Sequence, residues 1–183
     1  MGAVQRVRSV LRDLGEDVRA ASQHLVLVSW GGSVFLPRSG RRLLYRAMGA
    51  ELESAPGASF GFMGDPHNLR VAENVYFNQR VFVDALGPVS VGAGSAFGME
   101  VMILTSHHPV DAEGRWQADA IGLPVSVGER VWVGARAVLL PGAVIESDVI
   151  VAGGAVVAGR CRAGGLYAGV PARRIRDHAT GAA

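Results

Sequence analysis

Two neighbouring histidines, His107 and His108, precede Pro109 in a polar stretch that interrupts an otherwise regular part of the chain. An imidazole that titrates near the working pH can take a proton from a hydroxyl group and return it to a leaving group. Such a side chain could act as the general base when a group is transferred to an alcohol. A lone loop histidine is more often an ordinary surface residue, so its surroundings must decide.

The regular part is a repeat of six residues, in which every sixth position is apolar on both sides of the interruption. A period of six drifts off one face of an α-helix and differs from the alternation of a hairpin. It fits three short strands per coil, each pointing one large and one small residue inward, in a parallel β-helix of about four to five coils. The large positions are Val71, Phe77, Val83, Val91, Phe97, Ile103, Val127, Val133, Leu139, Ile145, Val151 and Val157.

The interruption runs from Ile103 to Val127 and is far too long for a coil corner, which points to function. His107 occupies the position four residues after Ile103, where a small residue would normally point inward. A histidine does not fit there, so we expect the chain to leave the coil at Thr105 or Ser106. His107 would then be exposed or line an acceptor site.

The repeat and its interruption resemble the hexapeptide-repeat acyltransferases, particularly the maltose and galactoside O-acetyltransferases and, at the N-terminal end, polysaccharide acetyltransferases. The resemblance covers the chain from about Leu69 to its end, and the segment TSHHP is similar to the T-x-x-H-P segment of that family. It implies a left-handed coil, which periodicity alone does not reveal, and it places the catalytic histidine at His108.

On the acceptor side, the resemblance implies that Asn78, thirty residues before His108, binds the acceptor hydroxyl beside the histidine. Tyr76 would line a sugar pocket. Arg80 and Asp84 lie near further substrate-binding positions of the family but depart from its residue types, so the acceptor stays open. Asparagine also suits a tight corner turn, which is the alternative interpretation of Asn78.

On the donor side, the resemblance implies acetyl-CoA as the acyl donor, bound along the last coils. Small residues would leave room for its pantetheine arm, and a backbone N–H would stabilise the oxyanion. Two arginines would contact the phosphates, although arginines in such a tail are often simply solvated. These residues are Trp132, Ala135 with its backbone N–H, Gly153, Ala158, Arg173 and Arg176. Family members are trimers with sites between subunits, so a homotrimer is expected, with the loop 110–123 reaching the next chain.

The chain is expected to be all-β apart from its N-terminal end: a helical segment at 1–50, the β-helix at 51–170 with its loop at 104–126, and a short tail at 171–183. Apolar residues at helical spacing predict one packing face on the first helix, and a second short helix should run from Arg41 to Met48 and end at Gly49. The apolar run 25–36 is too short to span a membrane. It should pack on the domain, with a weak membrane-surface contact as the alternative. The packing face predicted for the first helix comprises Val7, Leu11, Leu14, Val18, Ala21, Leu25 and Val28.

The composition limits the classes of partner that the protein is expected to bind. The net charge of +2 and the lack of a basic run with interleaved aromatic residues argue against nucleic acid. The single cysteine, Cys161, excludes an intrachain disulfide and fits a reducing compartment, and no secretory signal is evident. We therefore expect a cytoplasmic protein, with a peripheral position at the inner membrane face as the alternative.

These observations predict an acetyl-CoA-dependent O-acetyltransferase acting on a sugar, a glycan or a hydroxylated small molecule, with no metal. Three alternatives stay open. An amino-sugar acceptor could use the same base. A zinc hydratase like the γ-class carbonic anhydrases would need three converging histidines, whereas His107 and His108 are adjacent and His67 lies far upstream. A catalytically silent scaffold would have no reason to interrupt its own repeat.

Overall fold

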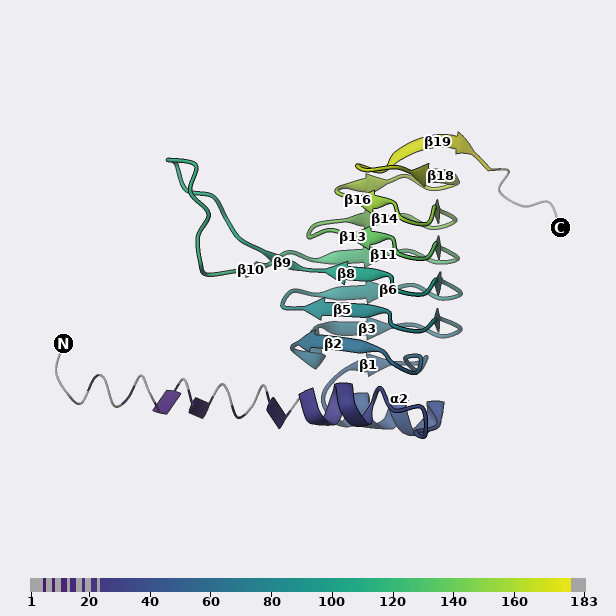
Figure 1. The fold of residues 1–183 in the computed structure, drawn as a ribbon. Helices are drawn as coiled ribbons and strands as arrows, with labels where there is room; N and C mark the ends of the chain where they lie inside the picture. The colour runs from purple at the N-terminus through teal and green to yellow at the C-terminus, as the bar shows by residue number, and fades with distance from the viewer. Residues whose placement is uncertain are drawn as a thin grey trace.

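The computed structural model describes residues 24–178 and, before them, residues 5, 8, 11–12, 14–15, 18 and 21–22. It is a straight stack of coils with helices at its N-terminal end and one long arm that leaves the stack halfway up (Figure 1). None of the described helices is long and apolar enough to cross a bilayer.

Each complete coil passes through three parallel sheets, which we call the first, second and third sheets in the order of the chain. The first sheet contains β1 (Glu51–Leu52), β3 (Leu69–Val71), β6 (Val89–Val91), β11 (Val125–Val127), β14 (Val144–Ile145) and β17 (Arg160–Cys161). The second contains β4 (Tyr76–Phe77), β7 (Ala96–Phe97), β12 (Trp132–Val133), β15 (Ile150–Val151) and β18 (Gly165–Ala168), with β19 (Arg173–Asp177) added antiparallel. The third contains β2 (Gly61–Gly64), β5 (Phe82–Ala85), β8 (Met102–Leu104), β13 (Val138–Leu139) and β16 (Val156–Val157).

The interior of the stack is the one that the repeat predicts. All twelve large positions are buried, with at most 4% of each residue exposed. Equivalent residues lie directly above one another: Phe77 pairs with Phe97, and their rings stack with centroids 5.0 Å apart. Each coil therefore covers the apolar face of the next, as a solenoid requires.

The stack has about six coils rather than the four to five predicted, since six strands lie in the first sheet. The additional coil at the N-terminal end begins at β1 and β2. Its buried residues Leu52, Phe60 and Phe62 do not follow the spacing of six, so the repeat could not reveal it.

Two helices close the N-terminal end of the stack: η1 (His24–Trp30), a π-helix, and α2 (Arg38–Ala47). Tyr45 of α2 is completely buried, donates a hydrogen bond to the Leu27 carbonyl at 3.0 Å and packs edge-on against Phe60 and Phe62. Gly49 follows α2 with a φ of +107°, which confirms it as the residue that ends the helix. A short 3₁₀-helix, η2 (Pro66–Asn68), leads into β3.

The predicted packing face of the first helix is wrong. Leu11, Leu14, Val18 and Leu25 are each more than half exposed, whereas Leu27, outside the predicted face, is buried. Around Leu27 the spacing is not that of an α-helix, because the π-helix η1 ends with the Gly31 N–H donating to the Val26 carbonyl five residues back. Val7 lies outside the described residues.

The interruption of the repeat forms the arm, residues 105–124, which contains β9 (Ser106–His107) and β10 (Ile121–Gly122) paired antiparallel. The chain leaves the coil at the predicted place, and His107 is exposed. At the other end of the chain, Arg173–Asp177 forms the strand β19.

Candidate functional site

The arm is a β-hairpin in which backbone hydrogen bonds continue beyond β9 and β10. Gln117 donates its N–H to the Pro109 carbonyl at 2.8 Å, and Asp111 donates to the Arg115 carbonyl at 2.9 Å. This ladder places residues 108 and 117 on facing strands, so the arm holds His108 in a defined position although the side chain is exposed.

The tip of the arm is fastened by the carboxylate of Asp111. It accepts the backbone N–H groups of Glu113 and Arg115, the Arg115 guanidinium at 3.0 Å and the Gln117 side-chain amide at 3.0 Å. The backbone N–H of Arg115 is the main reason that the pKa of Asp111 lies below its usual range. The charged form holds the turn, and with it the strand that carries Gln117.

His108 is oriented by a backbone group of that strand. Its Nδ1 lies 2.9 Å from the Gln117 carbonyl oxygen, and the Trp116 ring stands perpendicular to the imidazole at a centroid distance of 5.7 Å. A carbonyl oxygen only accepts, so Nδ1 carries the proton and Nε2 keeps a free lone pair. The ring is thus set as a proton acceptor, as a general base requires.

The point where the arm leaves the coil is held by Asp84. This carboxylate is only 4% exposed, and its Oδ2 accepts the backbone N–H groups of Thr105 at 3.3 Å and Ser106 at 2.9 Å. The Thr105 hydroxyl donates to the Asp84 carbonyl, and Leu123 closes the base of the arm by donating to the Thr105 carbonyl. Asp84 therefore anchors the arm, and its predicted contact with the acceptor stays a prediction.

Tyr76 and Asn78 lie on the other side of the stack, where the second sheet turns into the third. They line a hollow of about 360 Å³ together with Phe77 and Gln79. The rest of its wall comes from residues earlier in the chain: Val34, Leu36, Pro37, Arg38, Arg41, Gly57 and Ala58. The Asn78 Oδ1 accepts the backbone N–H of Gln79 at 2.8 Å, as in a corner turn, and its amide NH₂ has no partner among the described residues.

Arg80 lies on the same corner but is committed to an ion ladder. Its guanidinium binds Glu100 at 2.5 Å, and Glu100 also binds Arg136 at 2.7 Å. All three residues have positive φ and lie above one another on successive coils. The hydrogen bond from Arg136 is the main cause that lowers the pKa of Glu100. The ladder ties coils together, so the predicted contact of Arg80 with substrate stays a prediction.

The predicted donor residues lie at three places in the stack. Ala135 and Gly153 lie on the corner of Asn78, which we call the donor corner, and the Ala135 N–H has no partner among the described residues. Ala158 follows β16 and so lies at the next corner, across the third sheet. Arg173 and Arg176 are exposed on β19 at the C-terminal end of the stack.

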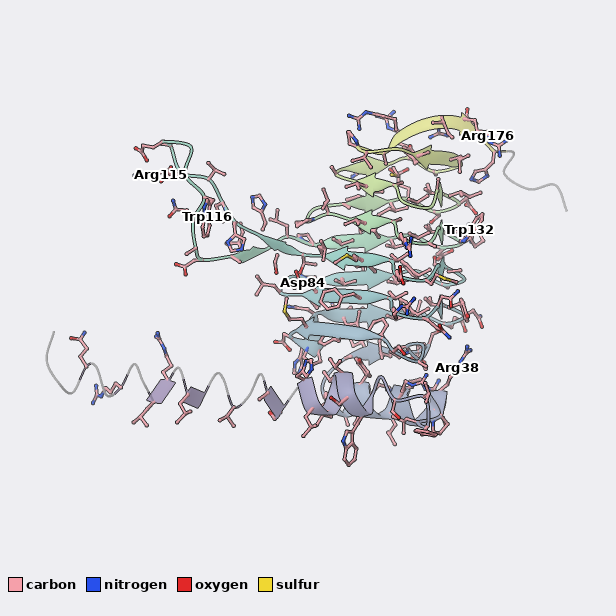
Figure 2. All side chains as sticks on the ribbon, viewed as in Figure 1. Arg38, Asp84, Arg115, Trp116, Trp132 and Arg176 are labelled. Carbon is pink, nitrogen blue, oxygen red and sulfur yellow. The ribbon has the colours of Figure 1, made fainter. Side chains whose placement is uncertain are left out.

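The structure does not bring the base and the donor corner together within one chain. Trp116, which contacts His108, lies far out on the arm, whereas Trp132 lies on the opposite side of the stack (Figure 2). The sequence did not point to the Gln117 carbonyl, to Asp111 or to the anchoring of the arm by Asp84. Only backbone geometry reveals them.

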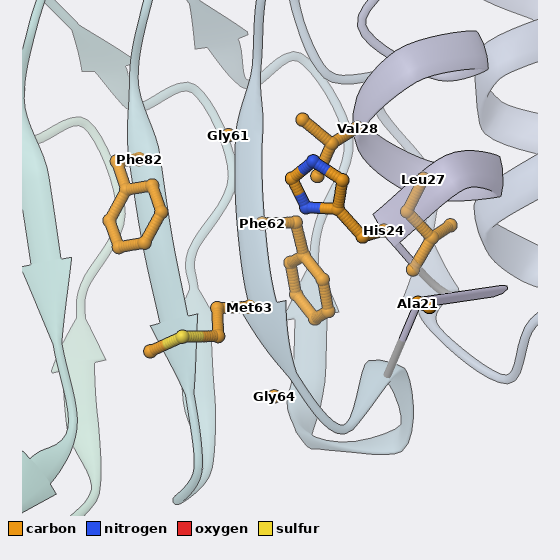
Figure 3. Close-up of a pocket in the computed structure, with 9 residues that line it drawn as sticks. All are labelled: Ala21, His24, Leu27, Val28, Gly61, Phe62, Met63, Gly64 and Phe82. Carbon is orange, nitrogen blue, oxygen red and sulfur yellow. The ribbon is translucent and has the colours of Figure 1, made fainter. Parts of the chain in front are cut away.

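Another hollow lies between η1 and β2, at the N-terminal end of the stack (Figure 3). It measures about 590 Å³ and is mostly apolar, with His24, Leu27 and Val28 on one wall and β2 and Phe82 on the other. Among the described residues, no group of three or more His, Cys, Asp or Glu side chains is placed to hold a metal ion.

Comparison with known proteins agrees with this architecture. Residues 124–159 match the family profile "Bacterial transferase hexapeptide (six repeats)". Nodulation protein L of Rhizobium leguminosarum bv. viciae is 35% identical over 95 residues, covering 52% of this chain and 47% of that protein. Galactoside O-acetyltransferase of Escherichia coli is 27% identical over 110 residues, covering 60% and 54%. The chain thus spans about half the length of these curated relatives.

Among solved structures, the hexapeptide-repeat acetyltransferase VCA0836 of Vibrio cholerae, complexed with acetyl coenzyme A, superposes with a TM-score of 0.70 at 24% identity. The match covers 86% of this chain and 90% of that one. At this identity the likeness concerns the fold. Residues 124–159 therefore contain hexapeptide repeats, and the chain has the left-handed parallel β-helix fold.

Proposed function

We propose that this protein is an acetyl-CoA-dependent O-acetyltransferase that acetylates a hydroxyl group of a sugar, a glycan or a hydroxylated small molecule. The observation that carries the proposal is His108, whose Nδ1 is bound to the Gln117 carbonyl so that Nε2 is free to accept a proton. The names of two similar proteins, a galactoside O-acetyltransferase and an acetyltransferase with bound acetyl coenzyme A, support it.

In the proposed reaction, Nε2 of His108 takes the proton of the acceptor hydroxyl as its oxygen attacks the thioester carbonyl. The new C–O bond forms, the C–S bond breaks, and the imidazolium returns the proton to the departing thiolate. The unpaired N–H of Ala135 would stabilise the oxyanion, and Asn78 would align the hydroxyl through its amide. Trp132, Gly153 and Ala158 would line the pantetheine arm, with Arg173 and Arg176 at the phosphates.

A homotrimer with shared sites is part of the same proposal, because one chain holds the base and the donor corner on opposite sides of the stack. The outer face of the third sheet supports it. Phe82, Met102, Val138 and Val156 stand in register up that face; Met102 is exposed and the other three are half-buried. An apolar sheet face of this kind is stabilised by packing on another copy. The apolar hollow of Figure 3 continues it at the N-terminal end.

We also place the protein in the cytoplasm, with a weak contact to the inner membrane face. Trp30, Phe35 and Leu43 of the N-terminal cap are 68%, 93% and 71% exposed. No acidic residue occurs between residues 24 and 50, whereas this stretch contains four arginines. Aromatic side chains beside cations suit an anionic lipid surface. Flotation with vesicles of anionic and of neutral lipid measures the contact, and equal absence of binding to both would exclude it.

The decisive variant is His108→Ala, assayed by thiol release from acetyl-CoA with a panel of glycosides. Loss of the base should lower kcat by about 10²- to 10⁴-fold. His107→Ala is the matched control, because this neighbouring histidine is also exposed and it is His108 that contacts the Gln117 carbonyl; the variant should keep its activity. Burial raises the pKa of the sole thiol, Cys161, to about 11, so the protein contributes little to the thiol signal. Full activity of His108→Ala would refute the assignment.

A further inference from the structure

The hollow beside Asn78 is lined by more positive charge than a site for a neutral sugar requires. Two of its lining residues, Arg38 and Arg41, are cationic, and none is Asp or Glu. The other polar groups at its wall are the Tyr76 ring and the amides of Asn78 and Gln79. A hollow with two guanidinium groups and no carboxylate attracts anions.

Arg38 is held at this hollow by an aromatic ring. Its guanidinium carbon lies 5.6 Å from the centroid of Tyr76, over the ring face. Among the described residues it makes no ion pair, although Glu53 and Glu73 line the neighbouring hollow with it. A cation–π contact orients the guanidinium while leaving its N–H groups free for an acceptor. Arg38 lies on the same side of the stack as Trp132, the side of the proposed donor corner (Figure 2).

Arg41 supplies an independent observation. It is 95% buried, and its terminal nitrogens donate to the carbonyls of Pro56, Leu36 and Ser33. Its Nε is buried and has no hydrogen-bond partner within the part of the chain that the structure describes. A buried charged group with an unused donor favours an anion nearby, since the carbonyls that hold it bring no compensating charge.

We infer that the acceptor is anionic: a sugar or glycan that carries a carboxylate or a phosphate, which Arg38 binds while Asn78 aligns the hydroxyl to be acetylated. This rests on the proposed acetyltransferase function and narrows its acceptor. A carboxylate or phosphate matches the planar fork of a guanidinium in two hydrogen bonds, whereas a neutral hydroxyl leaves the charge uncompensated. The N-terminal segment, which supplies both arginines, would then set acceptor choice.

The test compares acceptors that differ at C6, where a carboxylate in one replaces the CH2OH group of the other. p-Nitrophenyl β-glucuronide and p-nitrophenyl β-glucoside separate a carboxylate from a neutral sugar, and a hexose phosphate tests the other anion. Wild-type protein should show a kcat/KM at least about tenfold higher for one of the anionic acceptors than for the glucoside, as a charge-assisted pair implies. Equal values for charged and neutral acceptors would overturn the inference.

Arg38→Gln should remove this preference by raising KM for the anionic acceptor about tenfold more than KM for the glucoside. Arg42→Gln is the matched control: it lies on the same helix, loses the same charge and donates to the Glu53 carbonyl outside the hollow. An equal loss in both variants would contradict a role for Arg38. Calorimetry measures binding of the glucuronide to both variants without turnover. If the protein transfers no acetyl group but still binds the glucuronide through Arg38, the proposed reaction is refuted and the anion site is retained.

Discussion

At the scale of single residues, the orientation of His108 depends on a group that does not titrate. The Gln117 carbonyl fixes Nδ1 as the protonated nitrogen, and no carboxylate takes that place. The ring therefore keeps its orientation at every pH at which the hairpin persists, and Asp111, which fastens the hairpin tip, acts on the base only through the backbone. Asp84 has the corresponding task at the other end of the arm.

Asp84→Asn tests this task. The amide loses one acceptor oxygen and turns a donor toward the N–H groups of Thr105 and Ser106, so we expect a destabilisation of about 1–3 kcal/mol. The base of the arm should loosen, which lowers kcat more than it raises KM. Asp119→Asn, an exposed position on the same arm, removes the same charge and should change neither quantity. Chemical denaturation and steady-state kinetics measure both, and an unchanged kcat would show that Asp84 does not position the base.

At the scale of elements, the arm is an insertion at a corner that leaves the stack in register. Strands β6 and β11 lie on either side of it in sequence, yet Val89 pairs with Val125 and Val91 with Val127 as in uninterrupted coils. The base of the arm is narrow, because Leu123 donates to the Thr105 carbonyl at 2.8 Å. The stack therefore does not need the arm for its own strand pairing.

Replacing residues 107–121 by Asn-Gly tests this independence, since a two-residue turn of that type closes antiparallel strands such as Ser106 and Gly122. We expect an unchanged β-sheet circular dichroism spectrum and a melting temperature within a few degrees of the wild type, because loop closure varies slowly with length. Activity should fall to the level of His108→Ala. An unfolded product would show instead that the arm supports the coils.

The regular elements could be predicted from the sequence because the period of six in the sequence reflects the stacking of the coils. A large apolar residue such as Ile103 occurs at every sixth position, and each one is covered by its equivalent in the next coil. The N-terminal helices have no such constraint. A helical period shows that Leu14 and Val18 share a face, but not what that face meets, and the π-turn before Gly31 depends on tertiary packing around Leu27. The role of Asp84 likewise follows from where the chain leaves the coil.

At the scale of the whole molecule, the proposed site is complete only between two copies. His108 lies on the arm, and Asn78 lies across the stack, so neighbouring subunits would each contribute one of them. In this arrangement activity depends on assembly of the subunits. A charge on the apolar outer face of the third sheet, as in Val138→Glu, should therefore abolish both the assembly and the activity.

Mixing inactive subunits tests the shared site. We expect His108→Ala and Asn78→Ala homotrimers to be inactive, whereas co-refolded 1:1 mixtures should regain about a quarter of wild-type activity, since three in four trimers are mixed and each holds one intact site of three. Thiol release from acetyl-CoA measures the recovery. Mixtures of His108→Ala with itself give the baseline, and mixtures that stay at this baseline would place the site within one chain.

The narrow base of the arm also has a consequence for how such proteins diversify. A coil couples only to the coils directly above and below it, and the hairpin from Ser106 to Gly122 enters and leaves at adjoining points of one corner. A segment with this geometry can be replaced by another hairpin without a change in the pairing of the coils. Arms from other hexapeptide solenoids could be grafted between Thr105 and Leu123 without redesign of the scaffold, and new chemistry could arise by recombination at that corner while the stack below and above it stays untouched.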